Sequence, residues 1–249
     1  GTGNVAVGKD AMLYGTTGDY NVALGMLTLG GSDVSTGNHN ISIGRKSMFD
    51  NTSGNQNVAI GSSSLENNTT AANNTAVGFC SMKANTTGSE NTAIGEGALT
   101  ANTTADDSTA VGYRALCTQT TGCQSTAVGM NALYKVTTGI SNAALGDVAG
   151  DAITTGNQNV ALGSSALGAV TTGSSNVGIG QNSAGGSLTT GSNNITIGQN
   201  SGGDAMRALQ ASTSNNIVIG SNTHTVAYIK IDWTVTSDER DKMNFEEVP

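Results

Sequence analysis

The dominant feature of this sequence is a five-residue phrase that returns at a fixed period. It reads Asn-Val-Ala-Leu-Gly at 159–163 and Asn-Val-Ala-Ile-Gly at 57–61. Between Gly44 and Gly180, the closing glycine recurs every 17 residues. A constant period of this size is typical of solenoids, in which each repeat forms one coil that stacks on its neighbours. The closing glycines are Gly8, Gly25, Gly44, Gly61, Gly78, Gly95, Gly112, Gly129, Gly146, Gly163, Gly180, Gly198 and Gly220.

The composition excludes several other classes of protein. Only 4% of the residues are aromatic and 11% are charged, a bias that is often typical of disorder. Here the apolar residues recur in register with the repeat, which instead indicates an ordered solenoid. The net charge of −8 argues against a nucleic-acid surface. No apolar run approaches the length needed to cross a bilayer, so we expect no membrane insertion.

Each phrase predicts a short β-strand, because β-branched residues alternate with a small residue, usually alanine, between Asn and Gly. We expect the aliphatic residue before each glycine to face the interior of the coil as a core ladder. The alanine would then face outward, where something packs close against the backbone. The core ladder of the regular coils is Ile60, Val77, Ile94, Val111, Val128, Leu145, Leu162 and Ile179.

The second half of each coil carries a small residue and then a large one, as in Ala98-Leu99, which suggests another inward anchor. Thr-Gly pairs such as Thr87-Gly88 predict turns in which glycine adopts a positive φ. The asparagine that opens each strand is expected to stack on its equivalent one coil away, so that the side-chain amides bond along a ladder. This Asn ladder comprises Asn57, Asn74, Asn91, Asn142, Asn159 and Asn176.

One coil of 17 residues buries few aliphatic side chains, and the ordering of its backbone opposes folding. We therefore expect neighbouring coils and further copies of the chain to supply the missing contacts. With strands ~4.8 Å apart, a dozen coils form a rod on the order of 60 Å long.

The Asn-x-Ala-aliphatic-Gly coils resemble those of trimeric autotransporter adhesin heads and of phage tail-fibre proteins. The likeness covers residues 4 to about 220. It implies an all-β fold, a parallel β-solenoid of the left-handed β-roll type with about 12–13 coils, assembled as a homotrimer.

The end of the sequence favours the tail-fibre family. Residues 221–236 are expected to form a strand-rich connector after a shaft at 1–220. The phrase Ser237-Asp238-Glu239-Arg240-Asp241-Lys242 resembles the start of the self-cleaving intramolecular chaperone of phage tail spikes and tail fibres. The resemblance implies cleavage at Ser237-Asp238, with Ser237 as nucleophile and Lys242 as base. Residues 237–249 would then be the truncated start of this chaperone domain.

Other chemistry finds little support. We expect no cofactor and no metal site, because His39 and His224 are isolated, and Asp106-Asp107 is interpreted as a solvated turn. Three cysteines are too few for a disulfide framework, although Cys117 and Cys123 flank one turn and could pair. Paired threonines recur in each coil, as they do on ice-binding solenoids, but here they are adjacent rather than spaced Thr-x-Thr.

The resemblance to tail-fibre proteins implies a structural and host-attachment protein, the shaft of a trimeric viral tail fibre located in the virion. The only enzymatic activity would be autocleavage. Its partners would be two further copies of the chain, other virion tail proteins and a glycan or protein of the host cell surface. The alternative is a bacterial trimeric adhesin head at the cell surface, and a remote alternative is an ice-binding solenoid.

Overall fold

In the computed structural model, the described residues are 1–14, 17–31, 35–186, 188–203 and 209–221. They form an all-β parallel solenoid with one three-residue strand in each coil and no helix. The strands are β1 (Val5–Val7), β2 (Val22–Leu24), β3 (Ile41–Ile43), β4 (Val58–Ile60), β5 (Thr75–Val77), β6 (Thr92–Ile94), β7 (Thr109–Val111), β8 (Thr126–Val128), β9 (Ala143–Leu145), β10 (Val160–Leu162), β11 (Val177–Ile179), β12 (Ile195–Ile197) and β13 (Ile217–Ile219).

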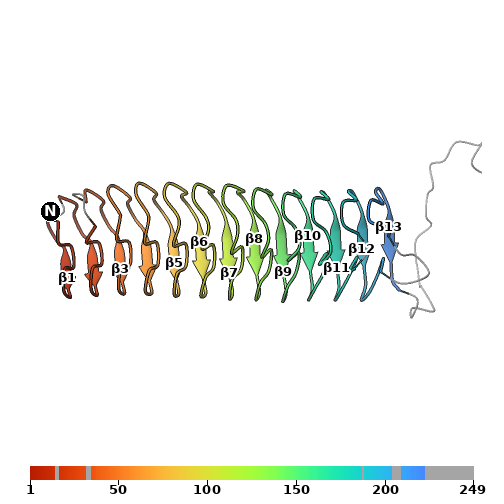
Figure 1. The fold of residues 1–249 in the computed structure, drawn as a ribbon, viewed down its shortest axis with the longest axis horizontal. Helices are drawn as coiled ribbons and strands as arrows, with labels where there is room; N and C mark the ends of the chain where they lie inside the picture. The colour runs from red at the N-terminus through yellow and green to blue at the C-terminus, as the bar shows by residue number, and fades with distance from the viewer. Residues whose placement is uncertain (15–16, 32–34, 187, 204–208, 222–249) are drawn as a thin grey trace, which may run out of the picture.

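The strands form a single parallel sheet in which each strand pairs with the strands before and after it in sequence. Equivalent residues pair throughout, so that Val58 lies opposite Thr75 and Ile60 opposite Val77. Longer coils keep this register, because Val177 still pairs with Ile195 after 18 residues and Ile195 with Ile217 after 22. The coils stack as a straight rod with every strand on the same side (Figure 1). The fold-class prediction of a parallel β-solenoid is confirmed.

The predicted orientation of the strand residues is wrong. The central alanines, such as Ala59, Ala76 and Ala93, are completely buried in the interior of the coils. The residues of the predicted core ladder point outward instead, and Ile94 and Leu145 retain 42% and 56% of their exposure. This correction applies to the whole predicted ladder, whose members are half-buried or exposed: Ile60, Val77, Ile94, Val111, Val128, Leu145, Leu162 and Ile179.

The physical reason is the narrowness of each coil. The large residues of the second half-coil, such as Leu99, Leu116 and Leu133, are fully buried and fill the interior. Gly178 occupies the central strand position of β11, and a Cβ placed there would lie 2.7 Å from the Cδ2 atom of Leu167. The wall opposite leucine therefore has room for little more than a methyl group, which favours alanine and turns the larger aliphatic residues outward.

The turns also differ from the prediction. The glycines of the Thr-Gly pairs do not adopt positive φ, and alanine replaces them at the equivalent positions Ala71 and Ala105. Left-handed backbone occurs elsewhere in each coil, for example at Ser63, Leu65 and Asn73, with φ of 58°, 49° and 61°. The glycine that closes each strand has φ between +87° and +138°, a region that essentially only glycine adopts at its upper end.

Candidate functional site

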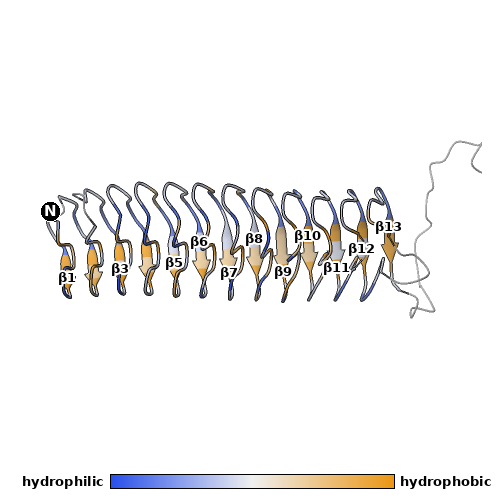
Figure 2. Cartoon of the chain, in the orientation of Figure 1, coloured by the Kyte–Doolittle hydropathy of each residue, from blue (hydrophilic) through white to orange (hydrophobic). Residues whose placement is uncertain are grey.

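The outward face of the sheet is an apolar surface that extends along the whole described rod. It consists of two parallel rows, the first and the third residue of every strand from β1 to β13, which we call the apolar strip. Figure 2 shows the strands along one side of the rod in orange toward its two ends and paler in the middle around β7, whereas the connecting segments are largely hydrophilic. The large exposed side chains of the strip are Val5, Val7, Ile41, Ile60, Ile94, Leu145, Leu162, Ile179, Ile197, Ile217 and Ile219.

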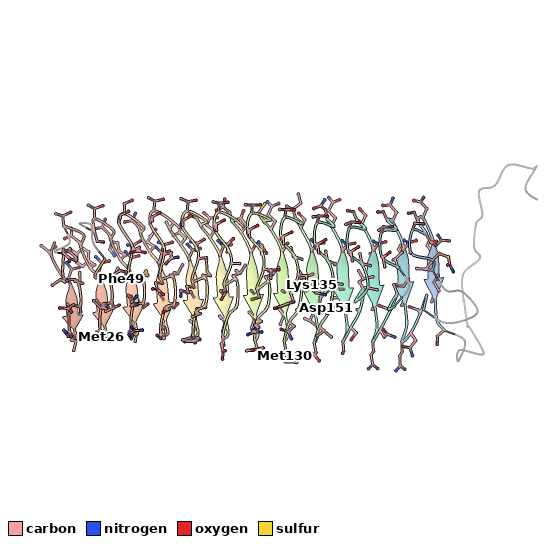
Figure 3. All side chains as sticks on the ribbon, viewed as in Figure 1. Met26, Phe49, Met130, Lys135 and Asp151 are labelled. Carbon is pink, nitrogen blue, oxygen red and sulfur yellow. The ribbon has the colours of Figure 1, made fainter. Side chains whose placement is uncertain are left out.

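The two rows differ in the middle of the rod. The third-residue row is aliphatic in every strand, while the first-residue row changes to threonine at Thr75, Thr92, Thr109 and Thr126. The residue after the closing glycine adds apolar surface in some coils, since Met26 and Met130 are 38% and 48% exposed and lie beyond the ends of the strands (Figure 3). A contiguous apolar face of this length is typical of a surface that is covered by a protein partner.

The asparagines that open the strands form hydrogen-bonded stacks inside the rod. The Nδ2 atom of Asn91 lies 3.2 Å from the Oδ1 atom of Asn74, and it also donates to the carbonyl oxygen of Ala105 at 2.8 Å. The Oδ1 atom of Asn91 accepts the backbone N–H of Ser108 at 2.9 Å. Each side chain thus ties its own coil to both neighbours. The predicted residues fall into two such runs: Asn57, Asn74 and Asn91, and Asn142, Asn159 and Asn176.

A second asparagine stack was missed by the sequence analysis. Asn51, Asn68, Asn85 and Asn102 are buried, and the Nδ2 atom of each of the last three donates to the Oδ1 atom of the asparagine one coil earlier at 2.9–3.0 Å. The signal was visible as asparagine recurring every 17 residues before Thr-Thr or Thr-Ser, and the Asn-x-Thr triplet at Asn85 arises from this stack. The coils after Gln119 carry apolar residues in place of asparagine at the same position: Val136, Ile153, Val170 and Leu188.

The change from polar to apolar interior occurs at Gln119. Its Nε2 atom donates to the Oγ atom of Ser108 at 2.9 Å, while its Oε1 atom is buried without a hydrogen-bond partner among the described residues. In the strand-opening stack, Ser108 and Ser125 replace asparagine at this level, and the Oγ of Ser125 accepts the N–H of Asn142 at 3.3 Å. The side-chain hydrogen bonds of the strand-opening stack are therefore weakest in the coils of Ser108 and Ser125.

The paired threonines divide into two rows with different surroundings. The first threonine of each pair donates its hydroxyl to a carbonyl of the next coil, as Thr86 does to Thr103 at 3.0 Å. The second is exposed, as at Thr87 and Thr104. Only one of the two rows therefore presents free hydroxyls to solvent.

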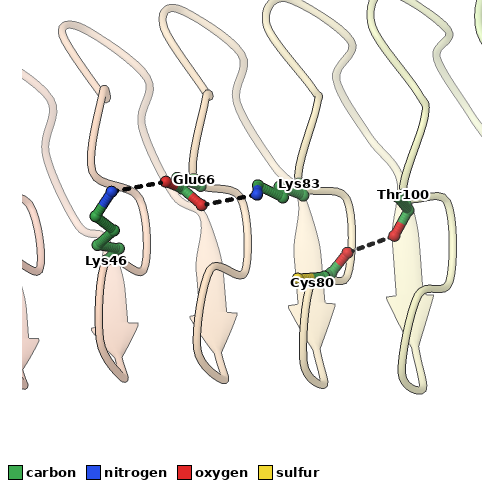
Figure 4. Close-up of polar contacts among 5 residues, drawn as sticks. All are labelled: Lys46, Glu66, Cys80, Lys83 and Thr100. Carbon is green, nitrogen blue, oxygen red and sulfur yellow. Dashed lines mark hydrogen bonds and ion pairs between the residues drawn. The ribbon is translucent and has the colours of Figure 1, made fainter.

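Charged side chains are sparse and link adjacent coils. Glu66 bridges Lys46 and Lys83, with N–O distances of 3.4 and 3.5 Å (Figure 4). Burial raises the pKa of this carboxyl, but the hydrogen bond from Ser63 and the two lysines outweigh burial, so the pKa lies below its ordinary value. Further along the rod, burial raises the pKa of Asp151 against the opposing charge of Lys135 (Figure 3).

The lowered pKa of Glu66 predicts a small pH-dependent stabilisation. A carboxyl with a depressed folded-state pKa stabilises the fold above its unfolded pKa, near 4.5, and the contribution is lost as the pH falls through the folded value. We expect Glu66→Gln to lower the free energy of unfolding by less than about 1 kcal/mol at neutral pH. Thermal unfolding of both proteins at neutral pH and at pH below the folded pKa checks this. A difference that grows on acidification would contradict it.

The remaining predicted site residues fall partly inside and partly outside the described ranges. Ser237, Asp238 and Lys242 lie outside the described residues, as does His224. His39 stacks on Tyr20 with ring centroids 5.2 Å apart. Asp106 and Asp107 are exposed, and Asp106 accepts the N–H of Ser89 at 2.7 Å.

Cys80, Cys117 and Cys123 are free thiols, and burial raises the pKa of the first two. Within the described ranges, no group of three or more His, Cys, Asp or Glu side chains could hold a metal ion. The same part of the chain contains no helix with the length and hydropathy to cross a bilayer.

Comparison of the chain with protein-family models, with curated proteins and with solved structures finds no match.

Proposed function

We propose that this chain is the shaft of a homotrimeric attachment fibre of a phage tail, with the coils wound as left-handed β-rolls. The observation that carries the proposal is the apolar strip, which runs along a rod of thirteen described strands. Three copies that turn this strip toward a common axis would remove the exposed aliphatic side chains from water. The role is mechanical: a stiff spacer that holds a receptor-binding surface away from the particle.

The energetics favour association along the whole strip. Covering an exposed Leu or Ile side chain stabilises a complex by roughly 1–2 kcal/mol after its existing partial burial is considered. Leu145, Leu162 and Ile179 are adjacent members of one row and are 56%, 37% and 37% exposed. Because such contacts repeat in every coil, their sum exceeds the cost of bringing copies together.

Sedimentation of the purified chain tests the assembly. We expect a species of three times the chain mass of 24.8 kDa at micromolar concentration. The double variant Ile94→Asp, Leu145→Asp places charges in the strip and is expected to weaken assembly by more than about 100-fold. The control double variant Thr87→Asp, Thr104→Asp adds the same two charges at exposed positions outside the strip and should leave the trimer intact. Circular dichroism checks that each variant remains folded.

A wild-type chain that sediments as a monomer at micromolar concentration would overturn the trimer and the shaft role together. A bacterial adhesin head of the same architecture is the alternative, and assembly alone does not separate the two. The mature product separates them by intact mass, since a species that ends at the Ser237-Asp238 bond is expected of a fibre and not of an adhesin.

A further inference from the structure

A hollow of about 300 Å³ opens on the side of the rod around Gly97, just after β6. Its lining includes Phe79, Glu96, Thr100, Arg114 and Tyr134, which come from four successive coils. At ~4.8 Å per coil, the hollow extends about 14 Å along the rod. This length matches one or two sugar rings.

Gly97 creates this hollow by lacking a side chain. The equivalent positions in neighbouring coils are Cys80, Arg114 and Asn131, which adopt left-handed φ values of 55°, 52° and 52°. Gly97 has φ of 67°, so the backbone at this position does not require glycine. A Cβ at Gly97 would meet only the Cγ atom of Arg114 at 3.4 Å and the Oγ1 atom of Thr100 at 3.7 Å. Glycine therefore leaves space that other coils fill.

The side chains around this space carry free polar groups. Among the described residues, Glu96 and Arg114 form no ion pair, and the hydroxyl of Tyr134 has no hydrogen-bond partner. The Arg114 guanidinium packs on the ring of Tyr113, with its central carbon 5.1 Å from the centroid. Thr100 donates its hydroxyl to the carbonyl of Cys80 at 2.6 Å, which joins two lining residues of the hollow (Figure 4).

Aromatic rings add apolar faces to the same hollow. Phe79 is 57% exposed, although phenylalanine is one of the rarest residues of the chain, and Tyr134 is half-buried. The negative face of an aromatic ring attracts the weakly positive C–H groups of a pyranose ring. The site thus presents aromatic faces next to the Glu96 carboxylate, which accepts hydrogen bonds, and the Arg114 guanidinium, which donates them. The Tyr134 hydroxyl can do either.

We propose that this hollow binds a short neutral saccharide of one or two rings. An apolar ligand would desolvate Glu96 and Arg114 without replacing their hydrogen bonds. A charged ligand would be repelled by one of these two groups, whereas sugar hydroxyls can donate to the carboxylate and accept from the guanidinium. The site deepens the proposed attachment role, on which it rests, by assigning a receptor contact to the shaft.

Saturation-transfer NMR on the intact chain tests the site with lactose, maltose, cellobiose and N,N′-diacetylchitobiose as probes. We expect at least one to bind with a dissociation constant on the order of 1 mM. Gly97→Asn fills the hollow with a residue that the fold already accepts at Asn131, and it should abolish binding. Ser165→Asn makes the matching change where Ser165 has φ of 56° in another coil, and it should bind like wild type. Glu96→Gln should weaken binding about tenfold.

The proposal is overturned if none of the four disaccharides binds, if Gly97→Asn binds as well as wild type, or if 3′-sialyllactose binds in preference to its neutral core. Sedimentation of the same samples keeps the two proposals distinguishable. A trimer that binds no sugar would contradict the saccharide site but agree with the proposed fibre shaft. A monomer would contradict the shaft role.

Discussion

Gly112→Ala is expected to lower the free energy of unfolding by roughly 3–5 kcal/mol. Gly112 has φ of +135°, and an added Cβ would lie 2.5 Å from the carbonyl oxygen and 2.7 Å from the carbonyl carbon of Gly129 in the next coil. Both atoms belong to the backbone, so relief requires the two coils to separate. That separation also lengthens the hydrogen bonds between β7 and β8.

Gly97→Ala is the matched control, since it makes the same substitution in the preceding coil. Its new Cβ meets only side-chain atoms at 3.4 Å or more, and neighbouring coils hold larger residues there. We expect a change of less than about 1 kcal/mol. Thermal unfolding compares the three proteins, and hydrogen exchange locates the loss of protection at β7 and β8. Equal destabilisation by the two substitutions would show that coil contact is not what excludes alanine at Gly112.

Asn91→Ala is expected to cost about 2–4 kcal/mol, the second of the large effects. The substitution removes the acceptor for the buried N–H of Ser108 and the 2.8 Å bond to the carbonyl of Ala105. That carbonyl keeps a bond from Asn102, whereas the N–H of Ser108 is left without its partner. A cavity inside the coil adds to the cost.

Asn67→Ala serves as the control for this experiment, because the half-buried Asn67 side chain makes no hydrogen bond with another described residue. Its expected effect is within about 0.5 kcal/mol. Asn91→Ser should fall between the two, since Ser108 and Ser125 show that a hydroxyl can occupy this position. Denaturation in urea measures all three variants, and an Asn91→Ala protein as stable as Asn67→Ala would mean that the stack contributes nothing to stability.

The period was enough to predict the strands and the stacking of equivalent residues. The 17-residue step places Val58 opposite Thr75 and Ile60 opposite Val77 regardless of what the turns do. The asparagines at the start of the strands follow from the same register. These features depend on spacing alone, and spacing is fully visible in a sequence.

The alternation of large and small residues did not predict which face of each strand is buried. Alternation states that Ala93 and Ile94 point to opposite sides, but it does not say which side is the interior. The general preference for burying the larger residue favours Ile94 as the interior residue. In the structure the fully buried Leu99 fills the opposite wall, so the smaller Ala93 is the interior residue. That decision depends on the width of the coil, which is a property of the folded backbone.

The hollow at Gly97 and the stack at Asn85 were missed for different reasons. The stack was detectable by aligning every position of the repeat instead of the strand alone. The hollow depends on how Phe79, Arg114 and Tyr134, distant from one another by 20 residues or more, converge around one missing side chain. Only the coil geometry brings them together.

The constant register has a consequence for how such a molecule can change in length. Because the backbone of each coil pairs with the next one in the same register, duplication of one 17-residue unit would add a single increment of about 4.8 Å and keep the strand pairing above and below it. The extra residues before β12 and β13 are absorbed without shifting the strand pairing. The length of the rod can therefore change in steps of one coil, and duplication of one repeat in the gene would add one such step.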